Sequence, residues 1–304
     1  MWHSFRIAPP QPIGWLLAVM LVMPAIARAD DPKRNDKPKD DKPATPAEQY
    51  QALLKEFGAA EQGFFKAFQE AKTDEERQKL MDTHPVYAFP PRFLEFAQKH
   101  AKDPAAFDAL SWITMRARAT DVRTVEVWNS AVDTILRDYI ESEKLAAVLT
   151  SMVYSYSPKG EHFLRTALEK SPRFEVQGHA CLALAQFLRW QVLTAERLRD
   201  DPTKVEQFEG FLGKERTEQI LKNDLPKVTQ ETEQLLERVL EEYAEVKHWR
   251  GTLGTAAEGE LFEIRNLAIG KVAPDIEGED IDGEQFNISD YRGKVVLVDF
   301  WGFW

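Results

Sequence analysis

Few residues of this chain have the types and spacing needed for redox, nucleophilic or metal chemistry. Among its 304 residues only Cys181 carries a thiol, so the printed sequence holds no internal disulfide, Cys-x-x-Cys redox pair or cysteine-rich zinc site. The six histidines are scattered, at positions 3, 84, 100, 162, 179 and 248. No His-Glu-x-x-His or paired-carboxylate motif accompanies them, so no metal and no cofactor is predicted.

Cys181 and His179 belong to a segment with helical periodicity, about residues 174–192. Cys181 shares one face with the apolar residues at 184, 185, 188 and 192. We expect the thiol to pack in the core as a small hydrophobe. The alternative, a reactive thiol, is disfavoured because no cationic neighbour is evident. His179 is expected to be a hydrogen-bonded packing residue rather than a ligand.

Composition places the chain among ordinary globular proteins. Hydrophobic residues make up 43% and charged residues 29%, which excludes a mostly disordered or fibrous chain. The length suits about two domains of roughly 100–200 residues. The net charge of −11 leaves no basic surplus to neutralise phosphates, so nucleic acid is not predicted as a partner.

The N-terminus has the features of a secretory signal peptide, predicted over residues 1–29. Arg6 precedes an apolar run from Ile13 to Met23, and Ala27-Arg28-Ala29 offers a cleavage site. The run is shorter than the roughly 20 residues that span a bilayer, so no stable membrane span is expected after cleavage. The protein is therefore predicted to be exported, periplasmic or otherwise extracytoplasmic. An uncleaved membrane anchor is the alternative.

Two further segments follow the signal peptide. Residues 30–45 are predicted to be a disordered charged linker, because the stretch up to Pro43 contains no apolar residue besides prolines. Residues 46–268 show helical periodicity and no convincing β alternation, and they are predicted to form an α-helical domain. The clearest stripe runs from Pro226 to Tyr243, with apolar residues three and four positions apart.

Local signals divide this region into successive helices. Thr73 and Glu76 form a capping box, and Asp103-Pro104 and Ser171-Pro172 each place an N-cap before a first-turn proline. Breakers are expected at 84–85, 89–91, 157–158 and 251–254. Short connections predict antiparallel helix pairs in a repeat of TPR-like or HEAT-like type, or an irregular bundle.

After residue 268 the pattern changes from helical to β. Asp282-Gly283 predicts a tight hairpin turn. Residues 289–293 predict one short helical turn. The apolar, β-branched run from Val295 to Trp301 predicts a strand buried on both faces.

Three pieces of this segment occur in a recognisable order. They are Ala-Pro-Asp from Ala273, the Asp-Gly hairpin with Ser-Asp-Tyr-Arg-Gly-Lys, and Val-Asp-Phe-Trp-Gly-x-Trp ending at Trp304. Together they resemble the opening of a thioredoxin-like domain of the TlpA/ResA type, within the redoxin (AhpC/TSA) superfamily. The resemblance covers about the last 35 residues, so 269–304 is predicted to be an incomplete thioredoxin-like domain. The helical region resembles, more loosely, the N-terminal extension of large exported bacterial redoxin-domain proteins.

The resemblance implies a thiol–disulfide oxidoreductase that acts in redox homeostasis, with protein disulfides or a redox partner as its partners. In the family this strand runs into Cys-x-x-Cys, so the attacking cysteine would follow Trp304. Asp299 matches a buried carboxylate that assists proton transfer, and Trp301 and Trp304 match aromatic residues packed around the active-site loop. The alternatives are a strand-end aspartate in solvent and simple core packing. The Trp-Gly-Phe-Trp ending differs from the Pro-x-x-x-Thr-x-x-Cys loop of peroxiredoxins.

The chain as printed is expected to lack thiol redox activity. A UGA codon after Trp304, read as selenocysteine, would explain a stop at this position, and so would a nonsense mutation or another truncation. A selenol would suit the attacking role because it is mostly anionic at neutral pH. The alternative function is a non-catalytic exported helical-repeat binding or scaffold protein with a vestigial redoxin domain.

Overall fold

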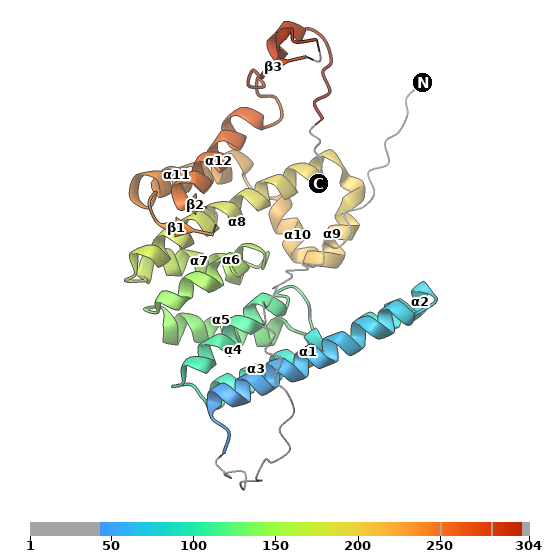
Figure 1. The fold of residues 1–304 in the computed structure, drawn as a ribbon, viewed down its shortest axis with the longest axis vertical. Helices are drawn as coiled ribbons and strands as arrows, with labels where there is room; N and C mark the ends of the chain where they lie inside the picture. Colours follow the sequence, from blue (N-terminus) through green and yellow to red (C-terminus); the bar gives the residue numbers. More distant parts are fainter. Residues whose placement is uncertain (1–42, 250, 281, 300–304) are drawn as a thin grey trace, which may run out of the picture. The chain divides into compact units, whose positions relative to one another are not determined.

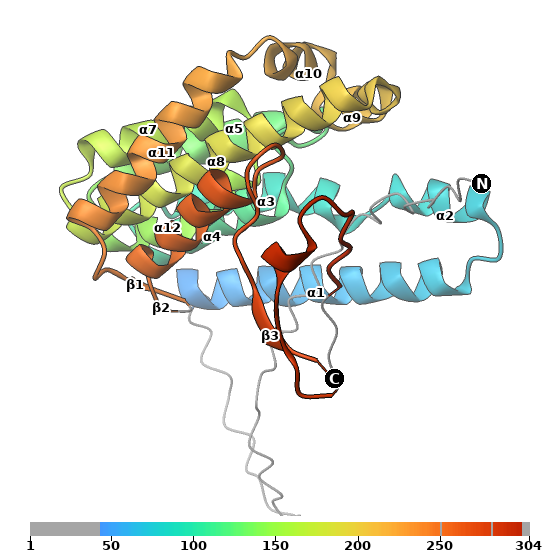
Figure 2. The same ribbon diagram turned by 90° about the horizontal axis from the view of Figure 1, so that it is seen from above.

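The computed structural model describes residues 43–249, 251–280 and 282–299. The predicted signal peptide and nearly all of the predicted linker lie outside these residues. From Ala44 onward the chain forms one compact unit. Within its described part the fold is mostly α, as the sequence predicts, with two small antiparallel sheets (Figures 1 and 2).

The α-helices follow one another with short connections. Their bounds are α1 Pro46–Glu70, α2 Asp74–Met81, α3 Pro85–Lys99, α4 Pro104–Arg116, α5 Val125–Tyr139, α6 Ala146–Val153, α7 Pro158–Lys170, α8 Phe174–Asp200, α9 Val205–Leu212, α10 Lys214–Leu221, α11 Leu225–Glu242 and α12 Leu253–Phe262. The shorter helical turns are η1 Glu143–Leu145, η2 Pro202–Lys204, η3 Glu263–Leu267 and η4 Ile288–Tyr291. The strands are β1 Lys247–His248, β2 Gly251–Thr252, β3 Glu277–Glu279 and β4 Gln285–Asn287.

Polar caps set the beginnings of several helices. The predicted capping box of Thr73 and Glu76 is confirmed at the start of α2. Thr45 forms a second capping box, in which its side chain accepts from the Glu48 N–H while Glu48 accepts from the Thr45 N–H at 2.8 Å. Asp103 caps α4, as predicted, with a proline in the first turn. Each cap satisfies an N–H group that has no partner inside its helix.

Two local predictions about helix ends are wrong. The expected breaker at 89–91 lies inside α3, where burial of Phe89 and Pro90 outweighs the hydrogen bonds that the prolines cannot donate. Phe89 packs edge-on against the Phe57 ring, with centroids 5.3 Å apart. Ser171 does not cap α8 but ends α7, since its N–H donates to the Ala167 carbonyl, and α8 begins only at Phe174.

The buried apolar residues form three clusters. The largest joins α1 and α3–α8, and a second joins α8, α11 and α12. The third joins the end of α8 to α9–α11. Helix α8 contributes to all three and contacts α6, α7, α10, α11 and α12 (Figure 1). Its apolar surface continues through Ala195 and Leu198, so the helix is longer than the predicted 174–192.

The stripe predicted from Pro226 to Tyr243 is confirmed in α11, where Thr232, Leu236 and Val239 are buried. The short β1–β2 pair at 247–252 was not expected, because two-residue strands leave no alternation to detect. Within the described part of the chain no helix is long and apolar enough to cross a membrane.

The last described segment holds one antiparallel hairpin, in which Gly278 of β3 pairs with Phe286 of β4. The hairpin turn at Asp282-Gly283 and the helical turn after it, η4, are confirmed. The strand predicted from Val295 is absent over residues 295–299, and Val295 and Leu297 are 102% and 93% exposed. No described segment pairs with these residues, so their backbone lacks the ladder that would make a strand.

Candidate functional site

One carboxylate joins two of the motif pieces in the C-terminal segment. Asp275, from Ala-Pro-Asp, accepts hydrogen bonds from the Ser289 N–H at 2.8 Å and from the Ser289 hydroxyl at 2.6 Å. The Ile288 N–H donates to the Ile276 carbonyl at 3.0 Å beside it. The hydrogen bonds from Ser289 hold the pKa of Asp275 below its ordinary value. Residues 275–276 are therefore fastened to residues 288–289 as an ionised clip.

The hairpin loop is organised by a second carboxylate. The side chain of Asp280 accepts from the N–H groups of Asp282 and Glu284, both at 2.9 Å. Gly283 has φ +84°, a left-handed conformation that glycine adopts without strain. The Gly283 N–H donates to the Asp280 carbonyl at 3.1 Å. The Asp-Gly pair thus builds the turn for the reason that the sequence indicates.

The residues predicted to serve redox chemistry are only partly visible. Asp299 is exposed, as are its described neighbours from Val295 on, so the burial that would favour its neutral form is absent here. Trp301 and Trp304 lie outside the described residues. The roles assigned to these three residues by resemblance stay predictions.

Cys181 is a packing residue, as predicted. Its side chain is fully buried in the second cluster, where the thiol donates to the Leu235 carbonyl at 3.3 Å. Burial raises the pKa of Cys181 to about 12, so the thiolate is scarcely populated at neutral pH. Because the thiolate is the nucleophile in disulfide exchange, Cys181 cannot carry that chemistry.

Two of the scattered histidines meet in space, which the sequence analysis did not foresee. The rings of His179 in α8 and His248 in β1 have centroids 5.7 Å apart, with planes inclined at 41°. Burial lowers the pKa of both imidazoles. For His179 the nearby His248 lowers the pKa further, whereas a hydrogen bond to the Lys247 backbone raises it. The two residues are 69 positions apart in the sequence (248 − 179), so no local pattern announces the contact.

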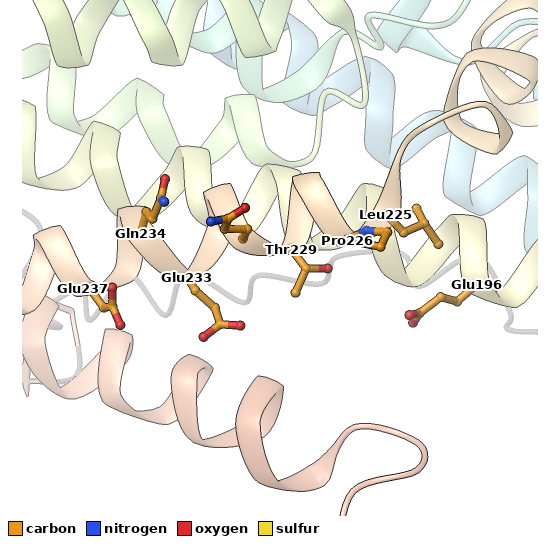
Figure 3. Close-up of a pocket in the computed structure, with 8 residues that line it drawn as sticks. Glu196, Leu225, Pro226, Thr229, Glu233, Gln234 and Glu237 are labelled. Carbon is orange, nitrogen blue, oxygen red and sulfur yellow. The ribbon is translucent and has the colours of Figure 1, made fainter.

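A cavity of 490 Å³ opens along α11 and the end of α8 (Figure 3). Its lining includes the carboxylates of Glu196, Glu233 and Glu237, together with Leu225 and Pro226. Arg265 bridges Glu233 and Glu237, with its Nε 2.9 Å from the Glu233 carboxylate. The positive charge of Arg265 offsets these carboxylates, and the lining contains no thiol, hydroxyl–histidine pair or other nucleophile.

Comparison with known proteins agrees with the motif pieces over a short part of the chain. Over 38 residues it is 45% identical to the thiol-disulfide oxidoreductase ResA of Geobacillus thermodenitrificans, which is 12% of this chain and 22% of that protein. Over 55 residues it is 34% identical to the ResA of Bacillus thuringiensis subsp. konkukian, which is 18% of this chain and 32% of that protein. The ResA of Geobacillus kaustophilus is 47% identical over 38 residues.

The chain therefore spans only about a quarter to a third of the length of these curated relatives. No protein-family model matches it, and no solved structure matches it. The partial matches to ResA proteins support a thioredoxin-like relationship for the matched segment.

Proposed function

We propose that this chain belongs to an exported thiol–disulfide oxidoreductase whose redox chemistry resides in a thioredoxin-like domain beginning near residue 269. The ordered motif pieces and the partial identity to ResA proteins support the proposal. The observation that carries it is the Asp275–Ser289 clip, which joins two of those pieces into one folded unit. The helical region 46–268 would then present this domain to partners.

The reactive thiols of the proposed enzyme lie outside the printed chain. Cys181 is buried and protonated, so the attacking and resolving cysteines would follow Trp304, where the resemblance places them. The attacking thiolate would displace one sulfur of a substrate disulfide and form a mixed disulfide. The resolving thiol would then release the reduced substrate, which gains two electrons while the enzyme pair becomes a disulfide. Asp299 would exchange the proton of the resolving thiol.

A helical scaffold without redox activity is the second candidate. It is favoured by the exposure of Asp299 and of residues 295–298, and by the burial of the chain's single thiol. The helical region buries three apolar clusters without any contribution from residues 270–299.

The nucleotide sequence after codon 304 separates the two candidates. An open frame that begins with a cysteine or selenocysteine codon, followed two residues later by cysteine, supports the oxidoreductase. UGA with a selenocysteine-insertion hairpin would identify selenocysteine as the attacking residue. No thioredoxin-like frame downstream would refute the oxidoreductase and leave the scaffold.

Activity provides the second test. The extended protein is expected to reduce insulin, and replacing its first cysteine or selenocysteine with serine should abolish turnover. Chain 1–304 is expected to be inactive, and the Cys181→Ser variant should be equally inactive. Catalytic turnover by chain 1–304 that survives this substitution would contradict the proposed chemistry.

A further inference from the structure

The junction between α8 and the β1–β2 hairpin brings two imidazoles into a geometry with a recognisable chemistry. Two rings whose nitrogens each lie about 2.0–2.1 Å from one zinc ion have centres roughly 5–6 Å apart. The centroids of His179 and His248 are 5.7 Å apart, and their planes are inclined rather than stacked. This spacing leaves room for one ion between the rings, whereas rings packed face to face would leave none.

The two elements that carry these histidines are fixed against each other by close backbone approaches. A Cβ on Gly178, next to His179, would come within 3.0 Å of side-chain atoms of both Leu253 and Tyr243. A Cβ on Gly254 would lie 3.0 Å from the Ala244 carbonyl oxygen. Only glycine fits at such distances, and both contacts hold the hairpin against α8. The separation of the histidines is therefore set by packing and not by two freely rotating surface side chains.

The core behind the hairpin makes this junction rigid. Tyr243, Val246 and Leu253 are buried in the second cluster. The Leu253 N–H donates to the Val246 carbonyl at 2.9 Å, and the Gly254 N–H donates to the Ala244 carbonyl at 3.0 Å. A metal site gains affinity when its ligands are held before the ion arrives, because less entropy is lost on binding.

The surroundings of His179 match those of a metal-bound histidine. Its ring bonds to the Lys247 backbone, and the direction of the pKa effect is that of a ring N–H donating to a carbonyl. Metal-ligating histidines usually donate their second N–H to a carbonyl or carboxylate, which fixes the ring and leaves the other nitrogen free as a ligand. Partial burial also keeps both rings neutral near pH 7, the form that binds metal.

We propose that His179 and His248 form a two-histidine site for a borderline transition-metal ion such as Zn²⁺. Among residues 43–249, 251–280 and 282–299 no third histidine, cysteine, aspartate or glutamate completes a cluster with them. The ion would therefore keep open positions for water or for a donor group of a bound molecule, as catalytic rather than structural zinc sites do. The site is independent of the proposed redox function, because it uses none of residues 269–304.

Calorimetric titration of the chain with zinc chloride tests the proposal. The wild-type chain should bind one Zn²⁺, and His179→Gln and His248→Gln should each weaken binding at least tenfold. His162→Gln is the matched control, because His162 is exposed on α7 and its ring contacts only the Thr166 hydroxyl, at 3.5 Å. This control should bind like the wild type. Absence of binding in the wild type, or equal binding by all four proteins, would overturn the site.

A second measurement uses the wild-type chain alone, so it does not depend on how the variants fold. In proton–carbon NMR spectra the ring signals of two histidines should shift on addition of Zn²⁺. The signals that disappear in the two site variants identify them as His179 and His248. Shifts confined to other histidines would refute the proposed site even if the titration shows binding.

Discussion

Gly178 offers a sharp test of the packing at the α8–hairpin junction through the substitution Gly178→Ala. In an open helix this change adds about 0.8–1.0 kcal/mol of stability, because alanine is the better helix former. Here the added Cβ would meet the Leu253 Cδ1 at 2.9 Å and the Tyr243 Cβ at 3.0 Å. Both neighbours are buried, so neither can swing into solvent. Overpacking of this kind costs about 1–3 kcal/mol.

The net expectation for Gly178→Ala is a loss of about 0–2 kcal/mol in the free energy of unfolding, the difference between these two terms. Gly58→Ala in α1 is the matched control, because nothing lies within 4 Å of its added Cβ. That variant should gain up to about 1 kcal/mol. Urea unfolding followed by circular dichroism measures both. If Gly178→Ala is as stable as Gly58→Ala, the close approach of α8 to the hairpin is not a real constraint.

Three further predictions concern a cap, the thiol and one histidine. Thr45→Ala should lower the free energy of unfolding by about 1 kcal/mol, since α1 loses its capping box, and urea unfolding would show it. Cys181 should resist a thiol-labelling reagent in the native chain and react fully in concentrated guanidinium chloride; rapid native labelling would contradict its burial. Burial lowers the pKa of His84 below its ordinary 6.5, so the unfolded chain takes up the proton first as pH falls. The free energy of unfolding should therefore fall below pH 6.5, and His84→Asn should remove part of that slope; identical slopes would refute the assignment.

The helices with strong local signals could be predicted from the sequence. The stripe of α11 and the capping box of Thr73 and Glu76 each lie within a few consecutive residues, so their pattern is readable without knowledge of the fold. The same holds for the Asp-Gly hairpin and for the burial of Cys181 on an apolar helix face. In each case the residues that decide the structure are neighbours in the sequence.

Features that depend on distant residues could not be predicted in this way. Pro90 remains helical because its surroundings in α3 bury it, although its local chemistry favours a break. The apolar run after Lys294 has strand propensity, yet propensity supplies no neighbouring strand to pair with. The meeting of His179 and His248 depends on two glycines that admit close packing, and glycine is more commonly a sign of a turn.

The central position of α8 has a consequence for how the helical region unfolds. Ala180 and Leu184 belong to the first apolar cluster, Cys181 and Ala185 to the second, and Ala195 to the third. Loss of α8 would therefore expose apolar surface in all three clusters at once. Cooperativity arises when one element is shared by several cores, since none of them can melt while the others keep that element in place. Helix α8 thus couples the clusters into a single thermodynamic unit, and a ligand bound at His179 would stabilise residues far from its own contacts.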